Sequence, residues 1–157
     1  MRQSTDKTWI LSNLEDTIAL GEALFQRMPN LTLLLLQGPL GAGKTSLVKG
    51  LANSLGISDP ITSPSFSLAQ HYPQGNPPLI HIDLYRLEDQ QAADELFLQE
   101  EEEAEGIGAI MAIEWPERLG LSLPEAWRLK LQHLNSGERL AELFYPSQEE
   151  RNSSTSS

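Results

Sequence analysis

The feature that most constrains this chain lies between residues 33 and 50, where an apolar run, LLLL, leads through QGPLGAG into Lys44 and Thr45. An apolar run without alternation predicts a strand that is buried on both faces, as parallel strands usually are. After the glycines we expect a helix from about Lys44 to Leu55, with Gly56 as its C-terminal cap. A buried strand, a glycine-rich loop and a helix in this order favour an α/β fold.

The loop fits the pattern G-x-x-x-x-G-K-[ST] at Gly38, Gly43, Lys44 and Thr45, which is the phosphate-binding P-loop. Glycines let successive backbone amides curl around a phosphate, where a Cβ would collide. The helix that follows directs its amides and its positive dipole end at the same anion. Lys44 would place a charge between the outer phosphates, and the Thr45 hydroxyl can bind Mg²⁺. The alternative, a glycine-rich turn with an incidental lysine, leaves the order of Lys44 and Thr45 unexplained.

Two apolar segments end in an acid, LIHID at Asp83 and IMAIE at Glu114. In an open α/β sheet, ligands bind beyond the carboxyl ends of the strands, so both carboxylates are expected to face the phosphate loop. A P-loop site needs an acid to hold the metal and often a group that orients the attacking water. The sequence does not decide which acid lies nearer to the metal. A capping role for Asp83 and a solvated Glu114 are the alternatives.

Three further polar features are candidates for the same site. The segment 62–67, TSPSFS, is rich in hydroxyls, and Ser65 is a candidate ligand for an outer phosphate; the alternative is an ordinary loop. His81 shares a strand face with Asp83, and either steadies the site or is a structural histidine. Arg86 either stabilises phosphate charge or forms a surface salt bridge.

The pattern of the remaining chain predicts one domain over residues 1–146. Residues 1–8 are polar and are expected to be loose, and SNLE predicts a capping box in which Ser12 caps a helix that ends near Arg27. Turn-forming residues predict two β-hairpins, over residues 65–85 and 127–145. Periodicity predicts an acidic helix over residues 88–106, and an apolar run predicts a further strand over residues 109–114.

Composition limits the classes of function. The chain has 157 residues, with 22 acidic against 11 basic side chains and a formal net charge of −11. A field of that sign repels phosphate backbones, so tight unaided binding to nucleic acid is not expected. The chain contains no cysteine, which excludes disulfides and thiolate metal sites. No apolar run approaches the roughly 20 residues of a membrane span, and we expect a soluble, cytoplasmic protein with a disordered polar tail at 147–157.

Four motifs stand in order along the chain: GPLGAGKT, SPSF, HIDLYR and IEWPER. Together with the chain length, they resemble the TsaE family of small bacterial P-loop ATPases over most of residues 8–145. The P-loop alone is generic, whereas HIDLYR and IEWPE are specific to that family. The chain departs from the family at Ser65, where a threonine is usual, and at residues 100–105, where an acidic stretch replaces a more apolar segment.

The resemblance implies a P-loop NTPase-like three-layer α/β sandwich with a mixed, mainly parallel central sheet. It implies an enzyme that binds ATP or ADP with Mg²⁺ and hydrolyses ATP slowly by itself, because no second cation for the transition state is evident. Such proteins are required for N6-threonylcarbamoyladenosine at position 37 of tRNA. They act with a TsaD-like transferase subunit and its paralogous TsaB-like scaffold subunit. They do not transfer the group themselves, they meet tRNA only indirectly through the complex, and they do not bind membranes.

The resemblance also assigns roles to residues of this sequence. Lys44 and Asp83 would be catalytic, with Asp83 orienting water or the metal shell. Thr45 and Glu114 would bind Mg²⁺, and residues 8–12 would lie near the base. The phosphates would be held by Gly38, Pro39, Leu40, Gly41, Ala42, Gly43, Lys44, Thr45 and Ser46, with Ser65 as a further contact.

Three other functions remain open on the sequence alone. A small-molecule kinase would usually carry an arginine-bearing lid, but only Arg86 and Arg118 fall between residues 50 and 120. A GTP-dependent switch lacks support, because the chain has no N-K-x-D element. A nucleotide-dependent docking module that does not hydrolyse ATP would tolerate loss of the Asp83 carboxylate.

Overall fold

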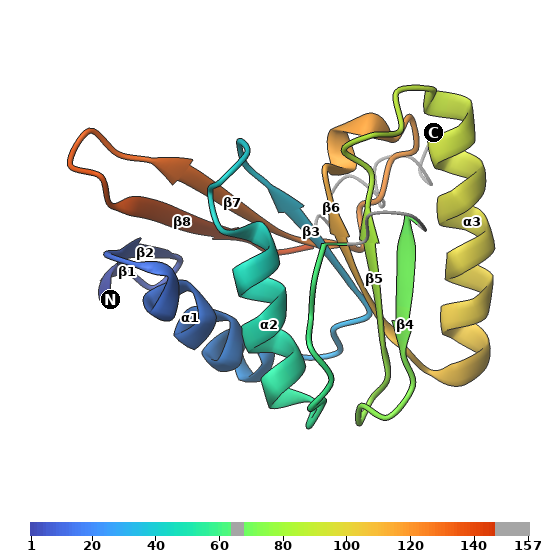
Figure 1. Ribbon diagram of the computed structural model, residues 1–157, viewed down its shortest axis with the longest axis horizontal. Coiled ribbons are helices and arrows are strands. Elements are labelled where there is room, and N and C mark those ends of the chain that lie inside the picture. Colours follow the sequence, from blue (N-terminus) through green and yellow to red (C-terminus); the bar gives the residue numbers. More distant parts are fainter. Residues whose placement is uncertain (64–67, 147–157) are drawn as a thin grey trace, which may run out of the picture.

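The computed structural model describes residues 1–63 and 68–146, which form an eight-stranded sheet, three α-helices and a short 3-10 helix (Figure 1). Ser65 and the predicted tail at 147–157 lie outside the described residues. Within the described part of the chain, no helix is both long and apolar enough to cross a membrane. The elements in chain order are β1 (Arg2–Thr5), β2 (Thr8–Leu11), α1 (Leu14–Arg27), β3 (Leu33–Gln37), α2 (Lys44–Ser54), β4 (Ala69–Tyr72), β5 (Leu79–Asp83), α3 (Gln90–Ile107), β6 (Ile110–Glu114), the 3-10 helix (Pro116–Arg118), β7 (Trp127–His133) and β8 (Arg139–Phe144).

The strands of the sheet follow the order β1-β2-β8-β7-β3-β6-β5-β4. The four inner strands β7, β3, β6 and β5 run parallel to one another. The pairs β1–β2, β2–β8, β7–β8 and β4–β5 are antiparallel and lie towards the two edges. The sheet is therefore mixed with a parallel centre, which confirms the predicted fold class.

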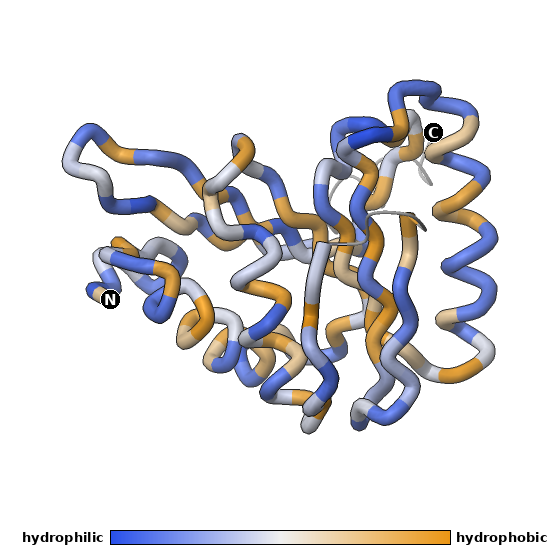
Figure 2. Tube along the Cα trace, viewed as in Figure 1, coloured by the Kyte–Doolittle hydropathy of each residue, from blue (hydrophilic) through white to orange (hydrophobic). Residues whose placement is uncertain are grey.

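Helices cover both faces of the sheet, so the fold has three layers (Figure 1). On one face, α1 and α2 pack against a cluster that includes Leu34 and Leu36 of β3. On the other face, Phe97 of α3 belongs to a cluster with Leu33 and Leu35 of the same strand. Figure 2 shows apolar residues following the central strands and the inner sides of the helices. Each face of β3 thus serves a different core, which explains why its apolar run does not alternate.

The predicted hairpins and helices are present. β4 pairs with β5, and β7 pairs with β8, with antiparallel register in both cases. α2 ends in a Schellman motif, because the Gly56 amide donates to the Asn53 carbonyl and the Ile57 amide donates to the Ala52 carbonyl. Gly56 has a φ of +76°, which glycine adopts without strain. Gly56 therefore caps α2 as predicted.

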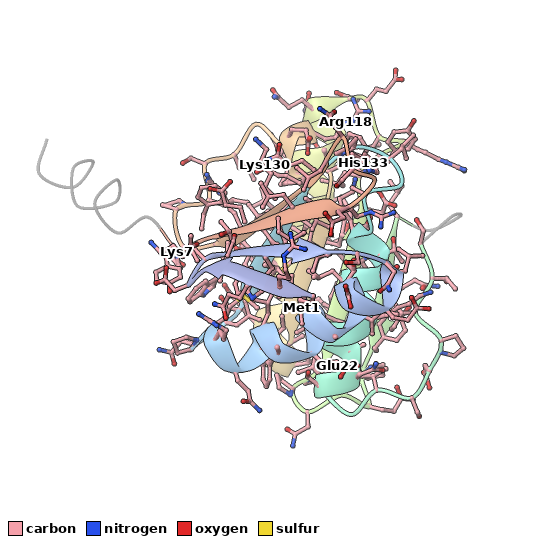
Figure 3. All side chains as sticks on the ribbon, turned by 90° about the vertical axis from the view of Figure 1, so that its left-hand side faces the viewer. Met1, Lys7, Glu22, Arg118, Lys130 and His133 are labelled. Atoms are coloured by element: carbon pink, nitrogen blue, oxygen red, sulfur yellow. The ribbon has the colours of Figure 1, made fainter. Side chains whose placement is uncertain are left out.

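The prediction that residues 1–8 are loose is wrong. They form β1 and the start of β2, and β2 pairs along its length with β8. The Leu143 amide also donates to the Lys7 carbonyl over 2.9 Å. Figure 3 looks onto this edge of the sheet, where Met1 and Lys7 are labelled. All four side chains of β1 are exposed, so the strand leaves no hydrophobic period in the sequence by which it could be recognised.

The N-terminal cap of α1 lies one residue later than predicted. Asn13, and not Ser12, is the N-cap, and its side-chain oxygen accepts from the Asp16 amide over 2.8 Å. The Asp16 carboxylate in turn accepts from the Ser12 amide over 2.9 Å. A reciprocal pair of bonds like that of a capping box is present, but Asn and Asp supply it in place of Ser and Glu. The helix ends at Arg27, as predicted.

α1 and α2 cross at two glycines. A Cβ on Gly21 would lie 2.3 Å from the Leu47 carbonyl oxygen, and a Cβ on Gly50 would lie 2.0 Å from the Ile18 carbonyl oxygen. No side chain fits into that space, so the two helix backbones are in direct contact. This contact fixes α2 against α1.

We expect Gly50→Ala to lower the free energy of unfolding by about 2 kcal/mol or more, because overpacking a filled space typically costs about 1–3 kcal/mol. Gly106→Ala is the matched control, since Gly106 lies in α3 and a Cβ there would have no packing neighbour within 4 Å. Removing a glycine from a helix interior should raise stability by about 0.5–1 kcal/mol. Urea unfolding measures both variants, and an unchanged midpoint for Gly50→Ala would contradict the close helix contact.

Candidate functional site

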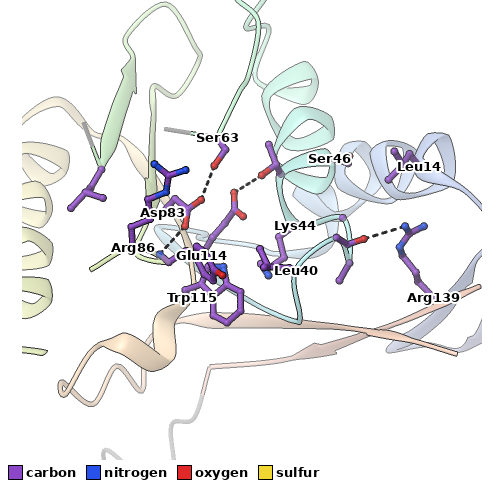
Figure 4. Close-up of a pocket in the computed structure, with 16 residues that line it drawn as sticks. Leu14, Leu40, Lys44, Ser46, Ser63, Asp83, Arg86, Glu114, Trp115 and Arg139 are labelled. Carbon is purple, nitrogen blue, oxygen red and sulfur yellow. Dashed lines mark hydrogen bonds between the residues drawn. The ribbon is translucent and has the colours of Figure 1, made fainter. Parts of the chain in front are cut away.

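The carboxyl ends of β3, β5 and β6 meet at one edge of the sheet, where a pocket of about 520 Å³ opens (Figure 4). The register of β3 and β6 pairs Leu36 with Glu114, and that of β5 and β6 pairs Asp83 with Glu114. Both predicted carboxylates therefore reach the loop that leaves β3. The pocket is lined by Leu14, Leu40, Gly41, Ala42, Gly43, Lys44, Thr45, Ser46, Ser63, Leu68, Asp83, Tyr85, Arg86, Glu114, Trp115 and Arg139.

The glycine-rich loop leads directly into the first turn of α2, which lines the pocket. Gly43 directly precedes the helix with a φ of +105°, and a Cβ there would lie 3.3 Å from Thr17 Cγ2. Gly43 therefore needs to be glycine both for its backbone conformation and for space. Within the described residues no side chain caps the first turn, so its free amides can bind an anion.

The Lys44 ammonium is held close to the loop backbone. It donates to the Gly38 carbonyl and, over 3.2 Å, to the Pro39 carbonyl. Gly38 and Pro39 are not among the residues that line the pocket, and they contact Lys44 through their carbonyl oxygens. Only 5% of Lys44 is exposed, and burial lowers the pKa of its amine. Nearby carboxylates oppose that shift, those of Glu114, Glu117 and Asp83.

Trp115 forms one wall of the pocket. Its ring centroid lies 4.2 Å from Lys44 Nζ, within the range of a cation–π contact. The ring also packs against Tyr85, with 4.9 Å between the centroids and an angle of 44°. Trp115 has a φ of +62°, which is uncommon for a bulky residue. With this backbone conformation, the indole lies beside Lys44 at the start of α2.

The Glu114 carboxylate makes hydrogen bonds with side chains of two elements, α2 and β5. The Thr45 hydroxyl donates to Glu114 Oε2 over 2.9 Å, and His81 Nε2 lies 2.7 Å from the same oxygen. Glu114 is only 3% exposed, and His81 is fully buried. Of the two strand-end acids, Glu114 is therefore the one hydrogen-bonded to Thr45.

Asp83 is held on the other side of the pocket. The Ser63 hydroxyl donates to its Oδ2 over 2.7 Å, and the Tyr85 amide donates to its Oδ1 over 3.0 Å. Both bonds fix the carboxylate, and Asp83 is partly exposed and lines the pocket. Arg86, the nearby candidate, also lines the pocket.

Several pocket residues were missed by the sequence reasoning, among them Arg139 and Leu14. Arg139, at the start of β8, lines the pocket and donates to the Gly41 carbonyl over 3.2 Å. Leu14, the first residue of α1, also lines the pocket. Residues 8–12, expected near the base, do not line it, and residues 8–11 of this segment form β2. No local pattern marks Arg139, because only the pairing of β8 with β2 and β7 brings it to the loop.

The oxygen atoms at Thr45 and Glu114 suit Mg²⁺, which prefers hydroxyl, carboxylate, phosphate and water ligands. Among residues 1–63 and 68–146, no group of three or more His, Cys, Asp or Glu side chains could hold a metal by themselves. Mg²⁺ is usually held by one or two protein ligands together with substrate phosphates. The donor set beside the phosphate loop is therefore compatible with a metal that arrives with a nucleotide.

The chain is similar to known proteins in sequence and in fold. The chain is 41% identical over 133 residues to the tRNA threonylcarbamoyladenosine biosynthesis protein TsaE of a Nostoc species, an alignment that covers 85% of this chain and 82% of that protein. It is 33% identical to the protein of the same name from Bacillus subtilis, over 87% of this chain and 83% of the relative. The crystal structure of Bacillus subtilis YdiB superposes with a TM-score of 0.69 at 28% identity and covers 90% of this chain and 86% of that one.

The family model described as threonylcarbamoyl adenosine biosynthesis protein TsaE matches residues 11–141. This match spans β3, the phosphate loop, both strand-end acids and Arg139. The chain belongs to the TsaE family.

Proposed function

We propose that this protein is a Mg²⁺-dependent ATPase that serves tRNA threonylcarbamoyladenosine biosynthesis. The observation that carries the proposal is the hydrogen bond from Thr45 to Glu114 at the start of α2. It joins a hydroxyl and a carboxylate suited to Mg²⁺ at the mouth of a phosphate loop, in a pocket that Lys44 also lines.

The phosphate end of the pocket supplies the electrostatic part of the reaction. The first-turn amides of α2 and the Lys44 ammonium bind the outer phosphates. When bound, Mg²⁺ neutralises charge on the phosphate oxygens. Lys44 can exchange its bonds to the Gly38 and Pro39 carbonyls for bonds to phosphate without leaving the loop.

We propose that Asp83 orients the attacking water. Its carboxylate lies across the pocket from the loop and is fixed by Ser63 and by the Tyr85 amide. A carboxylate held in this way can accept a hydrogen bond from water and align it with the outermost phosphate. Arg86 and Arg139 line the same pocket and are candidate cations for the developing charge.

We propose that the apolar part of the pocket takes a nucleobase. Leu14 and Leu40 line the pocket and are 47% and 61% exposed. A planar base would cover these two side chains, and the Arg139 guanidinium could stack on it. The chain has no N-K-x-D element, so adenine is the base we propose.

The names of the relatives and the charge of the chain support the proposed biological role. The relatives from the Nostoc species and from Bacillus subtilis are named for tRNA threonylcarbamoyladenosine biosynthesis. A net charge of −11 disfavours direct binding of tRNA. We therefore propose that the protein acts in the cytoplasm through a threonylcarbamoyl transferase subunit and its paralogous scaffold subunit, and that its ATP turnover is coupled to them.

Glu114→Gln should lower Mg²⁺-dependent ATP hydrolysis by about 100-fold or more, because the charge beside the Thr45 hydroxyl is lost at nearly constant shape. Release of inorganic phosphate by the purified protein at saturating ATP measures this change. Glu102→Gln, on the exposed face of α3 and outside the pocket, is the matched control and should hydrolyse ATP at the wild-type rate. Equal rates for the two variants would exclude Glu114 from the reaction.

Adding the transferase and scaffold subunits should raise the ATPase rate about tenfold or more, since a cation supplied by a partner can stabilise the transition state. Asp83→Asn should bind ATP normally yet lose this stimulation and fail to support threonylcarbamoyladenosine formation on tRNA. If Asp83→Asn supports the modification fully, a docking module that does not hydrolyse ATP explains the protein better. Turnover that instead requires a small-molecule phosphate acceptor would identify a kinase.

A further inference from the structure

A fully buried histidine lies behind the proposed metal site. His81 is 0% exposed and sits in the middle of β5, on the strand face that it shares with Asp83. Its Nε2 lies 2.7 Å from Glu114 Oε2, while its Nδ1 is buried without a hydrogen-bond partner among the described residues. Among the described residues, the side chain of His81 therefore makes one hydrogen bond, to Glu114.

The proton of this bond can be assigned from chemistry. An ionised carboxylate oxygen only accepts hydrogen bonds, so Nε2 of His81 carries the hydrogen and donates. In the neutral ring, Nδ1 is then an unprotonated acceptor with no donor to meet it among the described residues. A buried polar atom without a partner costs stability, and an apolar side chain would fill the same space without that cost. Core packing alone does not account for a histidine at this position.

The two donors to Glu114 share one oxygen. The Thr45 hydroxyl and His81 Nε2 both bond to Oε2, from α2 and from β5 respectively. These bonds fix the rotation of the carboxylate and leave Oε1 as the oxygen that a cation can take without breaking either of them. Because the Thr45 hydroxyl donates its hydrogen to Glu114, its lone pairs also stay available to a cation.

We propose that His81 is a positioning residue that sets the Glu114 carboxylate for a divalent cation. The proposal rests on the proposed function, since it concerns the metal of the same site. Partners that hydrogen-bond to metal-binding groups commonly contribute about 10- to 100-fold to metal affinity. His81 acts through Glu114 and has no contact with substrate in this role.

The test is Mn²⁺ binding to the full-length protein in the presence of ADP, measured by electron paramagnetic resonance of free Mn²⁺. His81→Asn, whose amide is too short to reach Glu114, should weaken Mn²⁺ binding by about 10- to 100-fold. His81→Gln extends its amide to the distance of Nε2 and should stay within about threefold of wild type. The tautomer is a second readout: in the ligand-free protein, ¹H–¹⁵N correlation spectra should show His81 protonated at Nε2.

His71→Asn is the matched control, because His71 Nε2 makes a bond of the same length, 2.7 Å, to Glu100 Oε2 away from the pocket. It should leave Mn²⁺ affinity unchanged. Wild-type affinity in His81→Asn, or an Nδ1-protonated ring, would overturn the positioning role while leaving the proposed ATPase intact. Failure of the wild-type protein to bind Mn²⁺ with ADP would overturn the proposed function itself, and the proposal with it.

Discussion

The parallel pairing of β3 between β6 and β7 is the constraint on which the site depends. Because β3 and β6 run in the same direction, the loop after Gln37 and the acid at Glu114 emerge at the same edge of the sheet. β5 adds Asp83 to that edge by the same rule. An antiparallel neighbour would place its carboxyl end at the opposite edge, and the acid would be separated from the loop by the length of a strand.

Polar atoms in this site are bonded to one another before any ligand is considered. Lys44 bonds to loop carbonyls, Thr45 and His81 to Glu114, and Ser63 to Asp83. Such bonds reduce the cost of burying these groups and hold the side chains in place. The side chains of the site are therefore largely held in place by hydrogen bonds within the protein itself.

Local patterns allowed the centre of the fold to be predicted. The apolar run of β3, the glycine spacing and the Gly56 cap each depend on neighbouring residues, and Asp83 and Glu114 mark strand ends. What could not be predicted depends on pairing across long stretches of chain. Arg139 reaches the loop only through the register of β8, and β1 has no buried face to reveal it. The choice between the two acids as the partner of Thr45 depends on side-chain geometry, which no periodicity encodes.

The direct backbone contact at Gly21 and Gly50 has a consequence for motion. Leu14 is the first residue of α1 and Thr45 lies in the first turn of α2, so two different helices contribute residues to the pocket. Helices separated by long side chains can slide, since rotamers adjust between them, whereas touching backbones leave nothing to adjust. α1 and α2 should consequently move as one rigid unit. Any shift of the first turn of α2 would then move Leu14 as well, and the spacing between Leu14 and Thr45 would be preserved.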